Sequence, residues 1–146
     1  MTGDLDICQD QGRVVFTATG TYQLVVDSND GGVGPFTVTW QTSRPDQNRP
    51  LRVDVPAVGT IDKPGAVDRW TFTAQANATL RVAPTASCTA SGLSWTVLNQ
   101  TGTPIAGSTA MCAGDIVAVP DAGRYQVVIS GTGAATGSYA FTAAVG

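Results

Sequence analysis

The sequence predicts an all-β protein: an antiparallel β-sandwich with jelly-roll-like topology, built from a tandem repeat of about 103 residues whose first copy is truncated. Three observations predict this fold: short segments that alternate apolar and polar residues, turn-forming residues between them, and a self-match at a fixed offset. Glycine occurs 17 times in 146 residues and charged residues make up only 13%. Many short strands separated by turns, with no helical periodicity between them, are typical of sandwiches.

One segment occurs twice in the chain. Residues 123–142 match residues 20–39 without a gap, at an offset of 103 positions. The pairs of identical residues are Gly123 and Gly20, Tyr125 and Tyr22, Gln126 and Gln23, Val128 and Val25, Gly137 and Gly34, and Thr142 and Thr39. A self-match at a fixed period predicts a tandem array. We therefore interpret each segment as the closing hairpin of one repeat, with Tyr125, Val127 and Ile129 facing the core.

The repeat divides the chain into three parts. Residues 1–43 are interpreted as the C-terminal portion of a preceding β-sandwich repeat. Residues 44–50 are polar, contain two prolines and break all periodicity, so they are interpreted as a linker. Residues 51–146 are interpreted as one complete domain. The strands expected in the first portion are residues 14–17, 21–26 and 36–41.

The complete domain has eight expected strands. Each alternates large apolar residues with small or polar ones, which is the period of a half-buried strand. Turn-forming residues separate the strands, as in the segments 62–65 and 76–77. The expected strands are residues 58–61, 68–74, 79–83, 93–98, 104–107, 115–119, 124–130 and 138–145.

The three cysteines fit the repeat. Cys112 and Cys8 precede their matched glycines by 11 and 12 residues, so we interpret them as the same half-cystine in successive repeats. Cys88 and Cys112 flank the expected strand 93–98, and a disulfide between them implies an oxidising, extracellular setting. The partner of Cys8 is then expected in sequence upstream of the chain. Buried free thiols are the alternative, whereas a zinc site is disfavoured because no C-x-x-C pair occurs.

A candidate calcium site lies in the turn 27–32. Asp27, Asn29 and Asp30 place three oxygen-bearing side chains in this turn, and calcium binds such oxygens. The matching turn, residues 130–133, has no carboxylate. The preferred interpretation is therefore a solvated hairpin turn, and no other metal or cofactor is expected.

The tryptophans could form a sugar-stacking platform or belong to the core. Trp70 shares a strand face with Phe72, and Trp40 shares one with Phe36 and Val38. Trp95 lies in phase with the apolar residues of its own strand. Because these are the more apolar faces, the strand phase favours core packing for all three tryptophans.

Composition argues against several classes of function. The net charge of −3 and the pI near 4.5 give no basic surface for nucleic acid. No apolar run is long enough to insert into a membrane. The sequence has no histidine, the commonest general base. It also lacks a nucleophile elbow, and Asp62 and Asp68 are expected to form only surface ion pairs with Lys63 or Arg69. We therefore do not expect an enzyme.

Three segments together resemble a known family. Residues 59–73 contain a glycine, a turn and then an aspartate before an aromatic-x-Phe strand. Residues 93–102 look like the central strand and turn of that family, and residues 122–141 look like its closing hairpin. Together they resemble the bacterial pre-peptidase C-terminal (PPC) domain and its relatives in large secreted repeat proteins. The likeness covers nearly all of residues 55–146 and, for the closing portion, residues 14–41.

The resemblance implies a secreted or cell-surface, non-catalytic β-sandwich that is appended to enzymes or strung in arrays. Some relatives bind calcium or polymers such as collagen or polysaccharide. We therefore predict a spacer, adhesion or accessory module whose partners are neighbouring domains or copies of itself. The alternatives are a module that binds polysaccharide or an extracellular protein, and a subunit of a surface filament that assembles by strand complementation. The last alternative arises because residues 14–41 alone would expose an apolar face and open strand edges.

Overall fold

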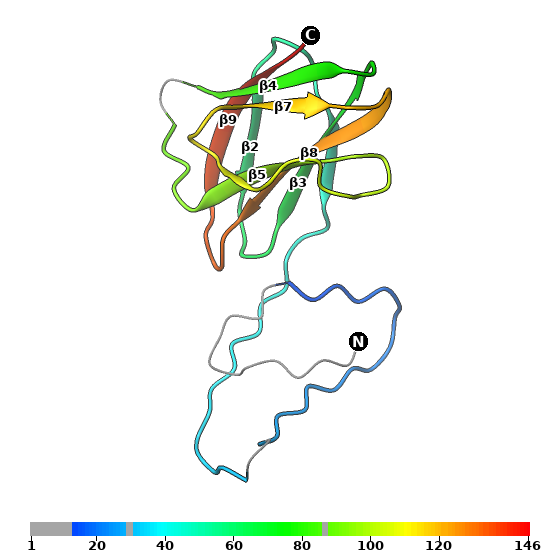
Figure 1. The fold of residues 1–146 in the computed structure, drawn as a ribbon. Helices are drawn as coiled ribbons and strands as arrows, with labels where there is room; N and C mark the ends of the chain where they lie inside the picture. Colours follow the sequence, from blue (N-terminus) through cyan, green and yellow to red (C-terminus); the bar gives the residue numbers. More distant parts are fainter. Residues whose placement is uncertain (1–12, 29–30, 86–87) are drawn as a thin grey trace. The chain divides into compact units, whose positions relative to one another are not determined.

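The computed structural model describes residues 13–28, 31–85 and 88–146. The chain divides into two units, Met1–Gln41 and Thr42–Gly146. The described part of the second unit contains nine strands in two facing sheets (Figure 1). The strands are β1 Gln47–Pro50, β2 Ala57–Ile61, β3 Val67–Ala74, β4 Ala78–Pro84, β5 Leu93–Leu98, β6 Thr109–Ala110, β7 Asp115–Val119, β8 Gly123–Gly131 and β9 Gly137–Val145.

The two sheets interleave segments that are distant in the sequence. One sheet has five strands in the order β1-β3-β8-β5-β6, and the other has four in the order β2-β9-β4-β7. All pairings between these strands are antiparallel except that of β1 with β3, which is parallel. The predicted all-β antiparallel sandwich is therefore confirmed.

Most strand predictions for the second unit hold to within one residue, and one is wrong. The expected strand 104–107 is replaced by the short strand β6, and only Pro104 of this segment forms an isolated bridge, with Leu98. Pro104 has no backbone N–H to contribute to a ladder. Gly102, just before it, has a φ of 80° and turns the chain. The segment therefore runs beside β5 without forming a regular ladder.

The predicted closing hairpin is not a hairpin. β8 pairs with β3 and β5, whereas β9 pairs with β2 and β4 in the opposite sheet. The face prediction is nevertheless correct, because Tyr125, Val127 and Ile129 of β8 are 0–3% exposed. Both β8 and β9 carry apolar residues at alternate positions, and placing them in different sheets lets both apolar faces line one core.

The core lies between the sheets and is rich in aromatic rings. Trp70 meets Phe141 edge-on at 6.1 Å between ring centroids, and Phe72 stacks on Tyr125 at 5.7 Å. Trp95 is 1% exposed. These residues come from both sheets, so the rings interlock the two layers. Core packing is thus confirmed for two of the three tryptophans.

The predicted linker is largely part of the sandwich. Gln47–Pro50 is strand β1, whose residues pair with Asp68–Thr71 of β3. The segment breaks the apolar alternation because it lies at the sheet edge, where its side chains alternate between half-buried and exposed. Its prolines are compatible with an edge position.

The first unit contains no strand in residues 13–28 and 31–41. The predictions of strands at 14–17, 21–26 and 36–41 are therefore wrong for this structure. Trp40, expected in a core, is 58% exposed, although the Phe16 ring lies near both its ring and that of Tyr22. Without neighbouring strands, the alternating pattern of these segments has no sheet to join.

Candidate functional site

A buried carboxylate lies at one end of the core. Asp68 of β3 is 1% exposed and is the only buried charged residue among those described. It follows the strand phase of Trp70 and Phe72, so its side chain points between the sheets. Tyr139 of β9 donates a hydrogen bond to its Oδ2 at 2.6 Å, and the indole N–H of Trp70 donates to the Tyr139 oxygen at 2.9 Å. This chain of hydrogen bonds joins the two sheets.

Arg44 closes the same end of the core from outside. Its guanidinium donates to Asp68 Oδ1 at 2.6 Å and to Asp62 Oδ1 at 2.8 Å. It also donates to the backbone carbonyls of Thr60 and Val67 at 3.1 and 3.5 Å. A buried charge requires such a partner, because desolvation of an unpaired carboxylate is costly. We call this group the Asp68 cluster, which consists of Arg44, Asp62, Asp68, Trp70 and Tyr139.

The cluster corrects the predicted surface ion pairs. Asp62 and Asp68 pair with Arg44 rather than with Lys63 or Arg69, and Arg69 instead pairs with Asp46 at 2.9 Å. Sequence reasoning missed Arg44 because it lies in the segment interpreted as a linker. The one signal in the sequence was the position of Asp68, in phase with apolar residues of its strand.

Burial and pairing set the protonation states in the cluster. Burial lowers the pKa of Arg44, but its hydrogen bonds to Asp68 and Asp62 outweigh this and raise it overall. The hydrogen bond from Arg44 lowers the pKa of the Asp62 carboxyl. Burial, together with the hydrogen bond to Asp68, raises the pKa of the Tyr139 phenol. Tyr139 therefore stays protonated at neutral pH and serves as a donor to Asp68.

Glycine at position 59 leaves space for the cluster. A Cβ placed there would overlap the ring and oxygen of Tyr139. Gly59 and Tyr139 are register partners on β2 and β9, so the tyrosine ring lies directly over the glycine. The glycine that opens the family-like segment thus has a packing role.

The disulfide prediction is confirmed. Cys88 and Cys112 are bonded, with their Cα atoms 5.5 Å apart. The bond joins the segment after β4 to the segment between β6 and β7. Under the chain-entropy account, a bridge across 24 residues contributes about 3 kcal/mol of stability. Cys8, interpreted as a half-cystine whose partner lies upstream, is outside the described residues.

The calcium prediction stays a prediction. Asp27 is exposed, and Asn29 and Asp30 lie outside the described residues. Within residues 13–28, 31–85 and 88–146, no group of three or more Cys, Asp or Glu side chains could hold a metal ion. The same part of the chain has no helix that is long and apolar enough to cross a membrane.

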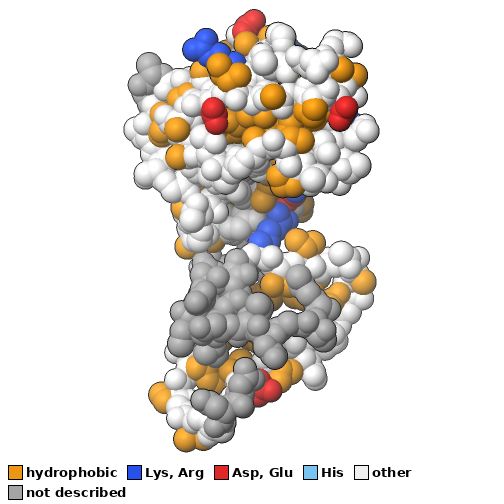
Figure 2. Space-filling view, in the orientation of Figure 1, with side chains coloured by type: hydrophobic (Ala, Val, Ile, Leu, Met, Phe, Trp, Pro, Cys, Tyr) orange, Lys and Arg blue, Asp and Glu red, His pale blue; other side chains and the backbone are white. Residues whose placement is uncertain are grey.

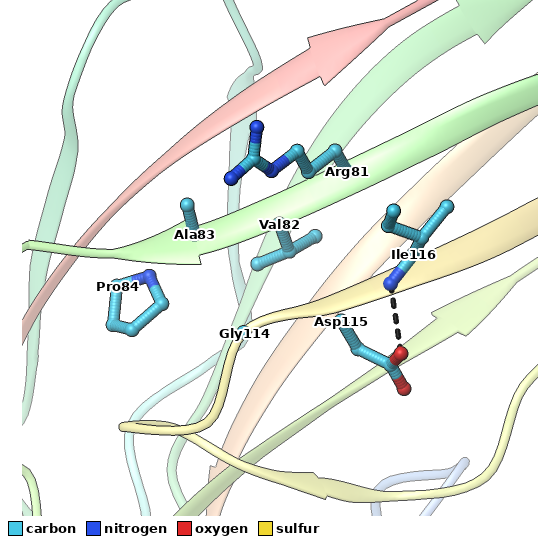
Figure 3. Close-up of a pocket in the computed structure, with 7 residues that line it drawn as sticks. All are labelled: Arg81, Val82, Ala83, Pro84, Gly114, Asp115 and Ile116. Atoms are coloured by element: carbon cyan, nitrogen blue, oxygen red, sulfur yellow. Dashed lines mark hydrogen bonds between the residues drawn. The ribbon is translucent and has the colours of Figure 1, made fainter.

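Two shallow grooves lie on the surface of the second unit. The larger, of about 480 Å³, lies over β4 and β7 and is lined in part by Arg81, Pro84, Asp115 and Ile116 (Figure 3). It is open to solvent, and the carboxylate of Asp115 accepts a hydrogen bond from the Ile116 N–H at 2.8 Å.

The smaller groove, of about 370 Å³, is polar. It is lined by Asn99, Thr101, Arg124 and Gln126, among others. The Asn99 side-chain oxygen already accepts bonds from the Thr101 N–H and hydroxyl and from the Thr103 N–H, so it organises the turn. Neither groove encloses a group that could act as a nucleophile beside a general base.

Solved structures share the fold at low sequence identity. No protein-family model matches the sequence, and no curated protein matches it. The structure of PliG from Aeromonas hydrophila, a periplasmic inhibitor of g-type lysozyme, matches with a TM-score of 0.57 and 13% identity, over 69% of this chain and 97% of that one. The PliG structure from Salmonella Typhimurium matches with a TM-score of 0.52 and 15% identity, over 68% and 99% of the two chains.

A second kind of domain also matches. The pre-peptidase C-terminal domain of a collagenase from Bacillus anthracis has a TM-score of 0.51 and 14% identity, over 70% of this chain and 99% of that one. The fold of this chain is therefore PPC-like, which confirms the resemblance at the level of structure. Identities of this size show the fold alone.

Proposed function

We propose that this chain is a non-catalytic, extracellular β-sandwich module of a larger secreted bacterial protein, acting as a spacer, adhesion or accessory domain. The Asp68 cluster carries the proposal. The buried ionisable groups of this cluster bind one another: Asp68 accepts from Arg44 and Tyr139 and is sealed from solvent. A catalytic carboxylate must reach a substrate, so this arrangement supports a structural role.

The extracellular setting has independent support. The Cys88–Cys112 disulfide suits an oxidising compartment. PliG is a periplasmic protein, and the PPC domain with the same fold belongs to a collagenase. The likeness to PliG supports a module that works outside the cytoplasm.

The tandem arrangement is also part of the proposal. In the second unit the Tyr125 hydroxyl donates to the Asp121 carbonyl at 2.8 Å, and in the first the Tyr22 hydroxyl donates to the Ala18 carbonyl at 2.6 Å. Both hydrogen bonds span four residues. The two tyrosines are 103 positions apart, and so are the two residues whose carbonyls accept the bonds. A tyrosine that bonds back to the chain before its strand is a recurring feature of β-sandwiches. We take residues 1–43 to be the closing part of a preceding repeat.

Two further roles remain as second candidates. A protein-binding module is favoured by the likeness to PliG, which inhibits another protein, and a polysaccharide-binding module is the related case. Filament assembly by strand complementation is favoured by the exposed apolar residues of the first unit. These include Leu24, Phe36 and Trp40, which are 58–65% exposed.

Two measurements on the full chain test the proposal. We expect no turnover in a broad panel of hydrolase substrates, because no described residue is arranged for catalysis. We also expect no retention on insoluble polysaccharides or collagen, and no inhibition of a g-type lysozyme, if the module is a spacer. Turnover that survives repurification would contradict the proposal. Saturable retention that is lost on unfolding would instead establish the binding role.

A further inference from the structure

The two edges of the four-stranded sheet differ in how they are protected. At the β2 edge, the backbone carbonyls of Val58 and Thr60 point away from β9, because both accept hydrogen bonds from side chains outside the sheet. Arg49 donates to the Val58 carbonyl at 3.0 Å, and Arg44 donates to the Thr60 carbonyl at 3.1 Å. Guanidinium groups over an edge prevent another strand from pairing there. The β2 edge is closed.

The β7 edge has no such protection. Thr79 of β4 exchanges both backbone hydrogen bonds with Gly146, at 2.6 and 3.0 Å, so it faces β9. The alternate residue, Leu80, then faces β7 and pairs with Val117. The backbone groups of Ile116 and Ala118 consequently point away from the sheet.

Only one of these outward groups has a partner among the described residues. The Ile116 N–H donates to the carboxylate of its neighbour Asp115 (Figure 3). The Ile116 carbonyl and both backbone groups of Ala118 have none in residues 13–28, 31–85 and 88–146. The Ile116 side chain is 63% exposed. Figure 2 shows hydrophobic side chains gathered on the face of the second unit that carries β7.

We propose that β7 is a self-association edge, which pairs antiparallel with β7 of a second copy about a two-fold axis at Val117. This register places Ile116 opposite Ala118 of the second copy, so the outward donors and acceptors of the two strands meet. The Ile116 N–H exchanges its Asp115 partner for a carbonyl of the second copy. Asp115 faces Val119, so like charges do not oppose one another. The two four-stranded sheets become continuous.

A second copy of this chain is the partner that fits the β7 edge, because the outward donors and acceptors of one β7 strand match those of another β7 strand in the antiparallel register. A two-fold contact uses the same surface on both partners, and it closes at two copies. A strand of five residues buries less than the roughly 1,200 Å² of a stable complex, so the contact is weak for isolated chains. In tandem arrays many such contacts act together and strengthen association without new chemistry.

Sedimentation of the full chain between about 10 µM and about 1 mM tests the contact, since weak interfaces dissociate in this range. We expect the mass to rise with concentration and to level off at two copies. Ala118→Pro removes an outward N–H and leaves the pairing with β4 intact, so this variant should stay monomeric. Val58→Pro makes the same change at the β2 edge and should associate like the parent chain.

Two further variants separate pairing at the β7 edge from association through the first unit. Ile116→Lys leaves the backbone unchanged and should weaken association at least about tenfold by charging the edge. Leu24→Glu changes an exposed apolar residue of the first unit and should have no effect on the mass. The inference is overturned if the parent chain is monomeric over the whole concentration range, or if its mass grows beyond two copies. It is also overturned if Leu24→Glu abolishes association while Ala118→Pro and Ile116→Lys do not. Thermal unfolding of each variant is the control that checks whether it is folded.

Discussion

The two units share the same alternation of apolar residues, but these residues are exposed in the first unit and buried in the second. Leu24 of the first unit is 65% exposed, whereas Val127, which matches it at the offset of 103 positions, is 0% exposed. Phe36 is 60% exposed, and Tyr139, which matches it at the same offset, is 3% exposed. In the second unit these residues lie on β8 and β9, and each of these strands has a hydrogen-bonded neighbour on both sides. The difference shows that alternation predicts which face of a strand is apolar, while neighbouring strands decide whether the strand forms.

The largest expected effect comes from supplying those neighbours to the first unit. We predict that joining a copy of residues 44–122 directly before Gly20 creates a second complete sandwich, because Gly20 matches Gly123 at the offset of 103 positions. Calorimetry should show about 70 kcal/mol of additional unfolding enthalpy for roughly 100 newly ordered residues. Trp40 fluorescence should shift to shorter wavelength as its ring becomes buried. The same fusion with Leu24→Lys should fail to gain the enthalpy, and an equal gain there would contradict the repeat.

The next largest contrast between the two units is the loss of stability when an aspartate is removed from each. We predict that Asp68→Ala destabilises the second unit by about 3–5 kcal/mol, because Arg44 and Tyr139 lose their shared acceptor. Asp27→Ala, an exposed aspartate of the first unit, should change stability by less than about 0.5 kcal/mol. Urea unfolding of both variants measures the contrast. Equal effects would mean that the Asp68 cluster does not hold the core together.

Truncating the matched apolar residues should give a smaller contrast. We expect Val127→Ala to cost about 2 kcal/mol, through lost burial and the cavity that remains. Leu24→Ala removes more atoms but should cost less than about 0.5 kcal/mol, because its side chain is already in water. Thermal unfolding of the two variants in the same buffer measures this. A large cost for Leu24→Ala would show that the first unit has a core of its own in solution.

The smallest expected effect is a loss of stability at alkaline pH. The pKa of Tyr139 is raised in the folded state, by burial first and by its bond to Asp68 second. Its contribution is therefore complete below the ordinary tyrosine pKa of about 10 and decreases as the pH rises above that value. The free energy of unfolding of the second unit should decline above about pH 10. Tyr139→Phe should flatten this decline, whereas Tyr22→Phe in the first unit should leave it unchanged.

The sequence was most informative where the evidence for an element is local. Alternation gave the bounds of β5 and β7 as the structure has them, and it gave the buried face of β8. The turn chemistry at 62–65 was also local: the Ala66 N–H bonds to the Lys63 carbonyl across the turn, and Gly65 has a φ of 73°. These features depend only on residues that are adjacent in the chain.

Long-range partners could not be predicted in the same way. β8 and β9 follow one another closely, yet they belong to opposite sheets, because each pairs with strands from earlier in the chain: β8 with β3 and β5, and β9 with β2 and β4. The sequence around Arg44 predicts a polar linker. Its guanidinium nevertheless binds and neutralises the carboxylate of Asp68, which lies 24 positions away in the sequence. The sequence by itself thus determined seven strands of the second unit to within one residue, their apolar faces and the cysteine pair, but not β1 or β6. The tertiary structure decided which strands pair, which charge is buried and which sheet edge stays open, because these depend on distances through space that no local pattern encodes.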